Sequence, residues 1–277
     1  FSFDSGTSPA VKQMRHKLLM ADAGSLNLEI DEIGLNLVGN TEVLTTFLEL
    51  YDKGKEKTKL IKKSADNSRN EEIRGNTPTN MMLFGTPSKL FDGAATEQAL
   101  YAMLDTGYAR RCFFGYLRGG AKDLSMTASQ IYDMNINSSN NAFLDDLSDT
   151  LGNLADIINV NKRLLMSKDT SILLIEYKLT CEKEAAKLPE HEEMRKAELS
   201  HRYFKVLKLA GAYAFIDDSS ELTEKHIYNA IKLAEESGAA FTRMLTRDRN
   251  YVKLAKYVAS VRRDVTQADL VEDLPFY

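Results

Sequence analysis

The chain has 277 residues, 43% of them hydrophobic and 27% charged, a balance typical of globular proteins with room for one large domain or two moderate ones. Its 36 basic and 40 acidic residues give a formal net charge of -4, so the overall charge does not indicate nucleic-acid binding, and any such site must be a local patch. Two cysteines without a CxxC spacing argue against a zinc site or a disulfide framework and favour a reducing compartment.

No apolar run is long enough to span a membrane, and no signal peptide is recognisable. We therefore expect a protein of the cytoplasm that does not act at a membrane. The chain begins with Phe1 rather than Met, and we expect it to be a fragment of a longer protein.

The first part of the chain alternates helix and strand patterns. Ser8 and Pro9 suit the cap and the first position of a helix, which carries an apolar stripe of period 3.6. A continuous apolar run opens residues 80–90 and indicates a strand buried on both faces. The other expected elements are a strand at 26–30, a helix at 41–51, a short strand-like piece at 59–61, a helix at 95–105 and a buried strand at 112–117.

From about residue 125 the pattern is helical throughout. Glycines and strand patterns become scarce, and apolar stripes follow Ser/Thr caps. The expected helices are 141–158, 170–188, 190–216, 223–246 and 250–263. We therefore predict a division into an α/β part at 1–120, a helical region at 125–248 and a short terminal part at 249–277.

The stretch SLNLEIDEIG places two adjacent acids, Asp31 and Glu32, directly after an alternating apolar strand. This is the form of a Walker B motif. An Asp at the carboxyl end of a strand can hold Mg²⁺, which prefers carboxylates and keeps several waters. The following Glu can polarise the water that attacks the γ-phosphate of ATP. The alternative is a strand that ends in a solvated acidic turn.

Two further features fit the same chemistry. The strand that opens residues 80–90 ends at Thr86, which occupies the position where such ATPases place a polar sensor beside the γ-phosphate. Arg110 and Arg111 precede the next apolar run, and arginines so placed can stabilise charge on the nucleotide of a neighbouring subunit. The alternatives are an ordinary strand end and a surface salt bridge.

One element of such a site is absent from the sequence. No G-x-x-x-x-G-K-[ST] loop occurs in the 277 residues. In P-loop ATPases this loop precedes the Walker B strand, so we expect it upstream of Phe1 and expect the chain alone to hydrolyse ATP poorly. A degenerate ATPase is the alternative.

Five stretches carry a resemblance to a known family: DSGTSPAVKQM, EIDEIG, FLELYDKGK, GNTPTNMMLFGTPSKL and GYARRCFFGY, within residues 4–118. Together they resemble the RecA-like P-loop ATPase domain of phage-type replicative helicases and primase–helicases. The resemblance implies a partial RecA-like α/β core with a parallel sheet, in a homo-oligomeric ring, a hexamer, that uses ATP and Mg²⁺ to move on single-stranded DNA in a bacterial host cell. A primase or other replication proteins are the implied partners.

The resemblance also implies the role of each residue. Asp31 would bind Mg²⁺, Glu32 would act as the base, Thr86 would be the sensor, and Arg110 or Arg111 would be the arginine finger. In the helical region, ELTEKHIYNAIKLAEESGAAF resembles a lid-type helix pair. Residues 249–277 resemble the start of a winged helix, with Thr266 as a helix cap.

Six lysines lie close together between the Walker B stretch and the sensor. In ring helicases loops at this place face the central pore, where lysines neutralise DNA phosphates. No aromatic residue lies among them, so binding would be independent of base sequence. The alternative is a solvated hairpin. The lysines are Lys53, Lys55, Lys57, Lys59, Lys62 and Lys63.

Other chemically interesting residues are interpreted as structural or surface residues. The four histidines lack the spacing of metal ligands, and the mixed-charge stretch 181–198 is typical of the solvated face of two helices around Pro189. Tyr and Phe in 201–216 recur at helical spacing and indicate core packing.

Two other functions stay open from the sequence. One is a catalytically inactive RecA-like or AAA+ module that serves as a scaffold or loader in a replication complex. The other is an AAA+ initiator or packaging ATPase, which shares the site chemistry and differs in strand order and lid.

Overall fold

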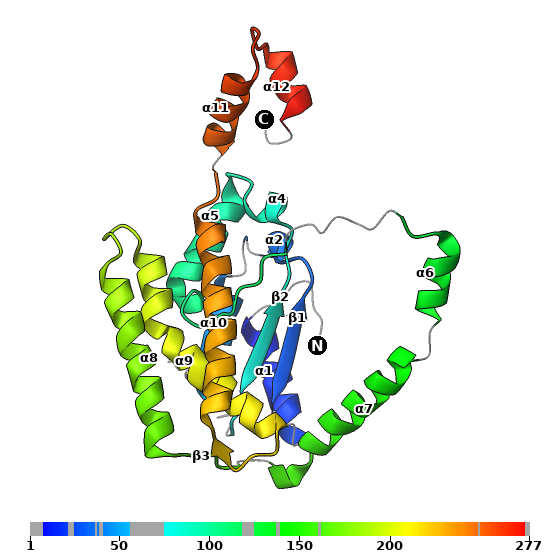
Figure 1. The fold of residues 1–277 in the computed structure, drawn as a ribbon, viewed down its shortest axis with the longest axis vertical. Helices are drawn as coiled ribbons and strands as arrows, with labels where there is room; N and C mark the ends of the chain where they lie inside the picture. Colours follow the sequence, from blue (N-terminus) through cyan, green and yellow to red (C-terminus); the bar gives the residue numbers. More distant parts are fainter. Residues whose placement is uncertain are drawn as a thin grey trace, which may run out of the picture. The chain divides into compact units, whose positions relative to one another are not determined.

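The computed structural model describes residues 8–21, 25–36, 38, 41–55, 75–117, 125–136, 139–159, 162–248 and 250–274. Over these residues the chain is mostly helical, with a small parallel sheet of two strands in its first part (Figure 1). Two compact units make up the chain, one from residues 1–109 and 247–277 and the other from residues 110–246. This agrees with the coarse expectation of a partial α/β core and a helical region.

The sheet of the first unit consists of β1 (Leu26–Ile30) and β2 (Thr79–Leu83). The strands are parallel and in register from Leu26 opposite Thr79 to Ile30 opposite Leu83. In β1 every second side chain is buried, as its alternating sequence predicts. Helices α1 (Ser8–Met20) and α3 (Thr41–Lys53) pack on that buried face. The core there is formed by Val11, Leu26, Leu28, Val43, Phe47 and Leu50.

The strand expected at the start of residues 80–90 exists as β2, but the expectation that it is buried on both faces is wrong. β2 ends at Leu83, and Met82 is 58% exposed. The apolar run was misleading because only one face of this sheet is covered by α1 and α3 in the described part of the chain. After the strand the chain forms a short helix, α4 (Pro87–Leu90), since Pro87 suits the first turn of a helix.

A buried polar joint connects α1, α3 and the start of β2. The amide of Thr77 donates to the carbonyl oxygen of Gly54 at 2.8 Å. The guanidinium of Arg15, which is 5% exposed, donates through Nε to Thr77 Oγ1 at 2.9 Å and through Nη2 to the carbonyl oxygen of Gly75 at 2.5 Å. Gly54 has φ +61°, and an added Cβ would lie 2.9 Å from the backbone nitrogen of Pro78, so no other residue fits well there.

The remaining helices of the first unit are short. They are α2 (Ile33–Asn36), α5 (Ala95–Met103) with a π-helical turn at Leu104–Tyr108, α11 (Asn250–Ser260) and α12 (Gln267–Asp273). The Tyr108 hydroxyl donates to the carbonyl oxygen of Leu44 at 2.6 Å and so ties the π-helical turn to α3. Thr266 caps α12 through its hydroxyl oxygen, as the sequence predicts.

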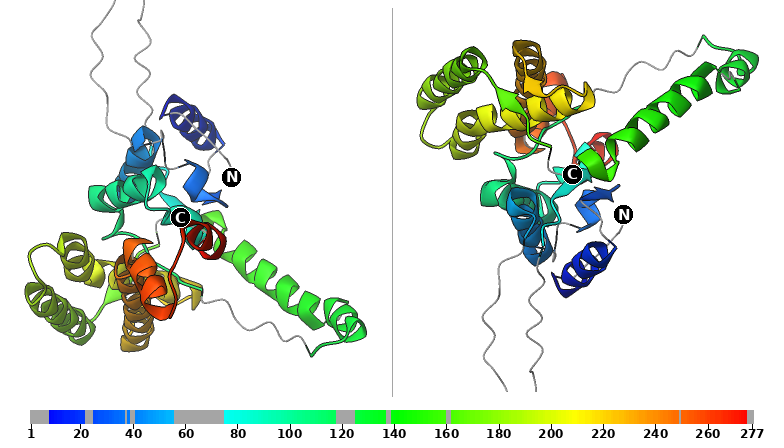
Figure 2. Two further views of the ribbon diagram at one scale, coloured as in Figure 1. Left: turned by 90° about the horizontal axis from the view of Figure 1, so that it is seen from above. Right: turned by 90° about the horizontal axis from the view of Figure 1, so that it is seen from below.

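Three long helices form the core of the second unit. Helix α9 (Glu193–Ile216) packs against both α8 (Lys168–Ala186) and α10 (Glu224–Leu245), and the three lie side by side in Figures 1 and 2. Their shared core includes Leu174, Val206, Ala210, Ala214, Ile227 and Ala230. Strand β3 (Leu165–Met166) directly precedes α8, and strand β4 (Glu221–Leu222) lies between α9 and α10. The two short strands pair in parallel.

The other elements of this unit precede β3. They are α6 (Ala128–Asn135), α7 (Ser139–Leu154) and a 3₁₀ turn at Ile157–Asn159. The helices expected at 141–158, 170–188, 190–216, 223–246 and, in the first unit, 250–263 all exist with slightly shifted ends. Helix α6 was not predicted, although Thr127 and Gln130 form a capping box at its start.

The expected strand at 112–117 is wrong. These residues have no regular secondary structure and no strand partner among the described residues. Their aromatic residues, which are typical of strands, are used differently: the ring of Phe114 stacks on that of Phe241 in α10, with 4.4 Å between the ring centroids.

No helix in the described ranges combines the length and the hydrophobicity that crossing a bilayer requires.

Candidate functional site

The carboxyl ends of β1 and β2 lie next to each other in the first unit. Beyond the last paired residues the Phe84 amide donates to the carbonyl oxygen of Ile30 at 2.9 Å, and the Ile33 amide donates to the carbonyl oxygen of Phe84 at 2.8 Å. Because the strands are parallel, the residues that follow them meet at one edge of the sheet. The structure therefore brings the acidic pair and Thr86 together.

Two hydrogen bonds join Glu32 to Thr86. The Thr86 hydroxyl donates to Glu32 Oε2 at 3.0 Å, and the Thr86 amide donates to Glu32 Oε1 at 3.4 Å. Thr86 is the residue before α4, but its side chain makes no capping bond to that helix. The hydroxyl instead donates to the Glu32 carboxylate and orients it.

Two glycines crowd this edge of the sheet. A Cβ at Gly34 would lie 3.2 Å from Glu32 Oε1, and a Cβ at Gly85 would lie 2.6 Å from the Leu90 side chain and 3.0 Å from that of Ile33. A Cβ would therefore displace the Glu32 carboxylate at Gly34, and the Leu90 and Ile33 side chains at Gly85. The sequence shows these glycines but not what they are close to.

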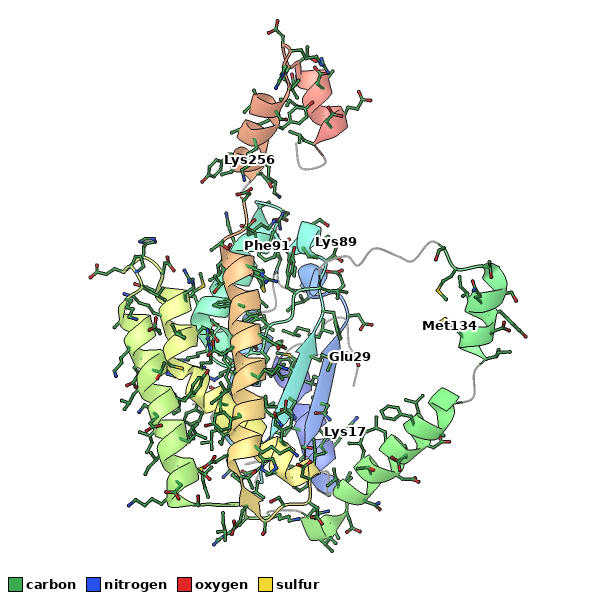
Figure 3. The ribbon with its side chains drawn as sticks, in the orientation of Figure 1. Lys17, Glu29, Lys89, Phe91, Met134 and Lys256 are labelled. Carbon is green, nitrogen blue, oxygen red and sulfur yellow. The ribbon has the colours of Figure 1, made fainter. Side chains whose placement is uncertain are left out.

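The segment after Thr86 is held in place by Arg247. Its guanidinium donates to the carbonyl oxygens of Pro87 at 3.0 Å and Phe91 at 3.3 Å, and its central carbon lies 4.9 Å from the centroid of the Phe91 ring. Lys89 and Phe91 are labelled at this turn in Figure 3. Arg247 also lines a cavity of about 310 Å³ between α5 and the start of α11. This arginine was not singled out from the sequence.

Asp31 is exposed at the same edge. Among the described residues no group of three or more His, Cys, Asp or Glu side chains is arranged to hold a metal ion. A single carboxylate nevertheless fits Mg²⁺, which is usually bound through one or two carboxylates together with waters and phosphate oxygens. Asp31 is therefore a candidate ligand at this edge, beside the Glu32 carboxylate.

The two arginines belong to the second unit. Arg110 is exposed and Arg111 is partly exposed. They precede an irregular segment, residues 112–117, that is bound to helices α9 and α10. The Lys205 ammonium donates to the carbonyl oxygen of Cys112 at 2.7 Å, and the amide of Phe114 donates to Ser237 Oγ at 2.7 Å.

Of the six lysines, Lys55 is described and exposed, and Lys53 is the last residue of α3. The side chain of Lys53 and the residues Lys57, Lys59, Lys62 and Lys63 lie outside what the structure describes, as does the strand-like piece expected at 59–61.

A buried cluster of charges in the second unit was missed by the sequence analysis. Glu198 is 2% exposed, and its carboxylate accepts from Arg202 Nη2 at 2.6 Å and from Lys205 Nζ at 2.8 Å. Arg202 also donates through Nη1 to Glu235 at 2.8 Å, and Glu235 accepts from the Tyr177 hydroxyl at 2.6 Å. The interpretation of 181–198 as the solvated face of two helices is thus wrong at Glu198, and Cys181 at the start of the stretch is buried as well.

The cluster changes the acidity of its members. Burial alone would raise the pKa of Glu198, but the hydrogen bond from Arg202 and the charges of Lys205 and Arg202 outweigh it and hold that pKa below its usual value. For Lys205 burial is the stronger effect and lowers the pKa, although Glu198 opposes it. Burial also raises the pKa of the Cys112 thiol to about 11.

The histidines agree with their interpretation as structural or surface residues. Three of them, His16, His191 and His201, are exposed. His226 is buried: its Nδ1 accepts from the Thr223 amide at the start of α10, and its Nε2 lies 3.2 Å from Asp217 Oδ2.

Comparison of the chain with models of known protein families, with curated proteins and with solved structures finds no match.

Proposed function

We propose that the first unit contributes the hydrolytic half of a P-loop ATPase site, in a RecA-like motor of the phage replicative helicase type. The observation that carries the proposal is the hydrogen-bonded pair of Glu32 and Thr86 at the ends of two adjacent parallel strands. The carboxyl edge of a parallel sheet is where open α/β sheets bind their ligands. The resemblance of residues 4–118 to such ATPases supports the same assignment.

In this proposal Glu32 is the general base. A carboxylate held by the Thr86 hydroxyl and amide keeps one orientation and can accept a proton from a water that attacks the γ-phosphate. Thr86 would sense the γ-phosphate through the same hydroxyl, because a bound nucleotide and Glu32 compete for that donor. Asp31 would hold Mg²⁺, which when bound neutralises charge on the phosphate oxygens.

The arginines and lysines complete the proposed motor. Arg110 and Arg111 would reach the nucleotide of a neighbouring subunit in a homo-oligomeric ring, the hexamer that the resemblance implies. The lysines from Lys53 to Lys63 would contact phosphates of single-stranded DNA without reading its bases. No residue of the 277 belongs to a G-x-x-x-x-G-K-[ST] loop, so the proposal assigns the triphosphate cradle to residues outside them.

That same absence favours a second candidate. A RecA-like or AAA+ module without a phosphate-binding loop would act as a scaffold or loader in a replication complex. In such a module the Glu32–Thr86 contact would only stabilise the sheet edge.

The test is DNA-stimulated ATP hydrolysis by the full-length polypeptide. Glu32→Gln keeps the size and the acceptor oxygen of the side chain but removes the base, so we expect unchanged binding of a fluorescent ATP analogue and turnover lower by about a hundredfold to ten-thousandfold. Glu29→Gln is the matched control, since Glu29 lies on the exposed face of the same strand (Figure 3) and should leave turnover unchanged.

Mixing two inactive variants distinguishes a ring motor from a scaffold. An inactive Arg110→Ala and Arg111→Ala protein mixed with Glu32→Gln subunits should regain turnover, because each supplies what the other lacks. Turnover of Glu32→Gln within twofold of the unmodified protein would contradict the assignment of the base. No hydrolysis by the intact polypeptide in the presence of single-stranded DNA would favour the scaffold.

A further inference from the structure

The segment that follows the arginine pair is held by the helices of the second unit. Two hydrogen bonds and one ring contact attach it, as described above: Lys205 to the carbonyl oxygen of Cys112, Phe114 to Ser237 Oγ, and the stacked rings of Phe114 and Phe241. The attached residues are one and three positions beyond Arg111. The backbone that carries the arginines is therefore anchored immediately after them.

Lys205 is unusually well fixed for a lysine. It is 2% exposed, and besides Cys112 it donates to Glu198 Oε1 at 2.8 Å. Its ammonium lies 5.8 Å and 5.5 Å from the ring centroids of Phe113 and Phe114, at cation–π distance. Burial removes the water that would otherwise compete for this cation, so releasing the Cys112 carbonyl would leave part of its hydrogen bonding unsatisfied.

Ser237 holds the segment by an independent contact. It lies on α10, is 3% exposed, and its hydroxyl oxygen accepts the amide hydrogen of Phe114. Lys205 lies on α9. Two different helices thus bind the backbone of the segment, in addition to the contacts that its aromatic side chains make.

We propose that Lys205 and Ser237 are positioning residues for the arginine pair: the helical unit, by holding Cys112 and Phe114, sets where Arg110 and Arg111 are presented to a neighbouring subunit. This rests on the proposed function, in which those arginines act on the nucleotide of another copy. The positional demand is strict, because displacing a catalytic group by about 1 Å can cost about a hundredfold in rate. Neither Lys205 nor Ser237 would itself contact the nucleotide.

The experiment uses three variants of the full-length polypeptide in a Cys181→Ser background. Ser237→Ala and Lys205→Met each remove one attachment. Glu235→Gln is the matched control, because Glu235 belongs to the same charge cluster through Arg202 but does not contact the segment. Ser237→Ala removes one oxygen atom from a helix, so it keeps the proposal testable even if Lys205→Met does not fold.

Two readouts are measured for each variant. The first is the rate at which a thiol reagent modifies Cys112 in the native protein without nucleotide. We expect this rate to rise about tenfold or more in both attachment variants, since a partly buried thiol becomes more reactive when its segment opens. Loss of the Lys205 cation would by itself make the Cys112 thiolate scarcer, so a faster reaction in Lys205→Met reports release of the segment.

The second readout is ATP hydrolysis. We expect kcat to fall about tenfold to a hundredfold with little change in KM, and turnover to return when the variant is mixed with Glu32→Gln subunits, which carry intact attachments. Glu235→Gln should change neither readout. Unchanged labelling of Cys112 in both attachment variants would overturn the proposal.

Faster labelling with normal kcat, while Glu32→Gln is inactive, would also overturn the positioning role and leave the proposed function standing. If Glu32→Gln hydrolyses ATP normally, the proposed function fails instead, and the labelling rates still decide whether Lys205 and Ser237 hold the segment.

Discussion

Replacing Glu198 by Gln should destabilise the second unit strongly. The carboxylate is buried between two cations, with Arg202 Nη2 at 2.6 Å and Lys205 Nζ at 2.8 Å. Gln has nearly the same volume, so the substitution opens no cavity. What it removes is the negative charge that compensates Arg202 and Lys205, and their burial cannot be relieved without disrupting the packing of α9 against α8 and α10.

The size of the destabilisation depends on which interactions Arg202 and Lys205 retain in the Glu198→Gln protein. Removing one partner of a buried ion pair costs about 3 to 5 kcal/mol because the other charge is left uncompensated. Arg202 retains Glu235 at 2.8 Å, and the amide oxygen of Gln still accepts one hydrogen bond. We therefore expect the free energy of unfolding to fall by about 3 kcal/mol, at the lower end of that range.

The assay is equilibrium unfolding in urea at pH 7, followed by the helical signal in circular dichroism. Glu182→Gln is the control: Glu182 and Lys178 are also one helical turn apart, but their side chains are 47% and 40% exposed. Exposed pairs of this kind contribute less than about 1 kcal/mol. A Glu198→Gln protein that is no less stable than Glu182→Gln would refute the view that the Glu198 charge holds this cluster together.

The same reasoning gives a pH dependence. Because the pKa of Glu198 is lowered in the folded state, its carboxylate stabilises the fold above its ordinary pKa of 4.5, and this contribution is lost as the pH falls through the folded value. The difference in unfolding free energy between the unmodified protein and Glu198→Gln should thus be constant near neutral pH and narrow below pH 4.5. A difference that stays constant down to the acid-unfolding limit would contradict the lowered pKa.

Three further outcomes are expected. Gly54→Ala should lower the unfolding free energy of the first unit by at least about 2 kcal/mol in urea titrations. The reason is that the φ of +61° at Gly54 and its 2.9 Å approach to the backbone nitrogen of Pro78 both exclude a Cβ. A loss of less than about 1 kcal/mol would argue against this geometry. Gly34→Ala should leave stability unchanged or slightly higher but reduce ATP turnover about tenfold, since its Cβ displaces the Glu32 carboxylate; equal turnover would mean that this carboxylate position is not needed. Modification of Cys112 by a thiol reagent should accelerate about tenfold per pH unit from pH 8 to a midpoint near 11, and a plateau near pH 9 would contradict the raised pKa of this thiol.

Sequence patterns correctly predicted the helices and strands that are determined by residues within the element itself. Strand β1 has the predicted bounds because its alternation of apolar and polar residues matches one buried face. The long helices α8 to α10 were predicted from apolar stripes and Ser/Thr caps. The Walker B form and the polar residue after β2 could also be found in the sequence, since each directly follows a strand. Their hydrogen bond could not, because it depends on the two strands being neighbours.

The wrong predictions share a physical cause: the composition of an apolar or charged stretch does not determine which other element it packs against. Residues 112–117 have the aromatic content of a buried strand, but the ring of Phe114 stacks on a residue of a helix and not on a neighbouring strand. Glu198 lies in a stretch with many solvated charges and is nevertheless buried. One signal was present: Glu198, Arg202 and Lys205 have the i, i+4, i+7 spacing of a single helix face.

The joint between Gly54 and Thr77 has a consequence for how this protein can change over evolution or in the laboratory. Its hydrogen bond, together with those from Arg15 to Thr77 and Gly75, brings the chain back beside α3 before β2 begins. The backbone on either side of residues 56–74 is therefore held to the core by these bonds. For a flexible segment between two fixed ends, doubling the length costs only about 0.6 kcal/mol in closure entropy. We therefore expect a change of sequence or length between these two ends to leave the geometry of the edge that carries Glu32 and Thr86 unchanged.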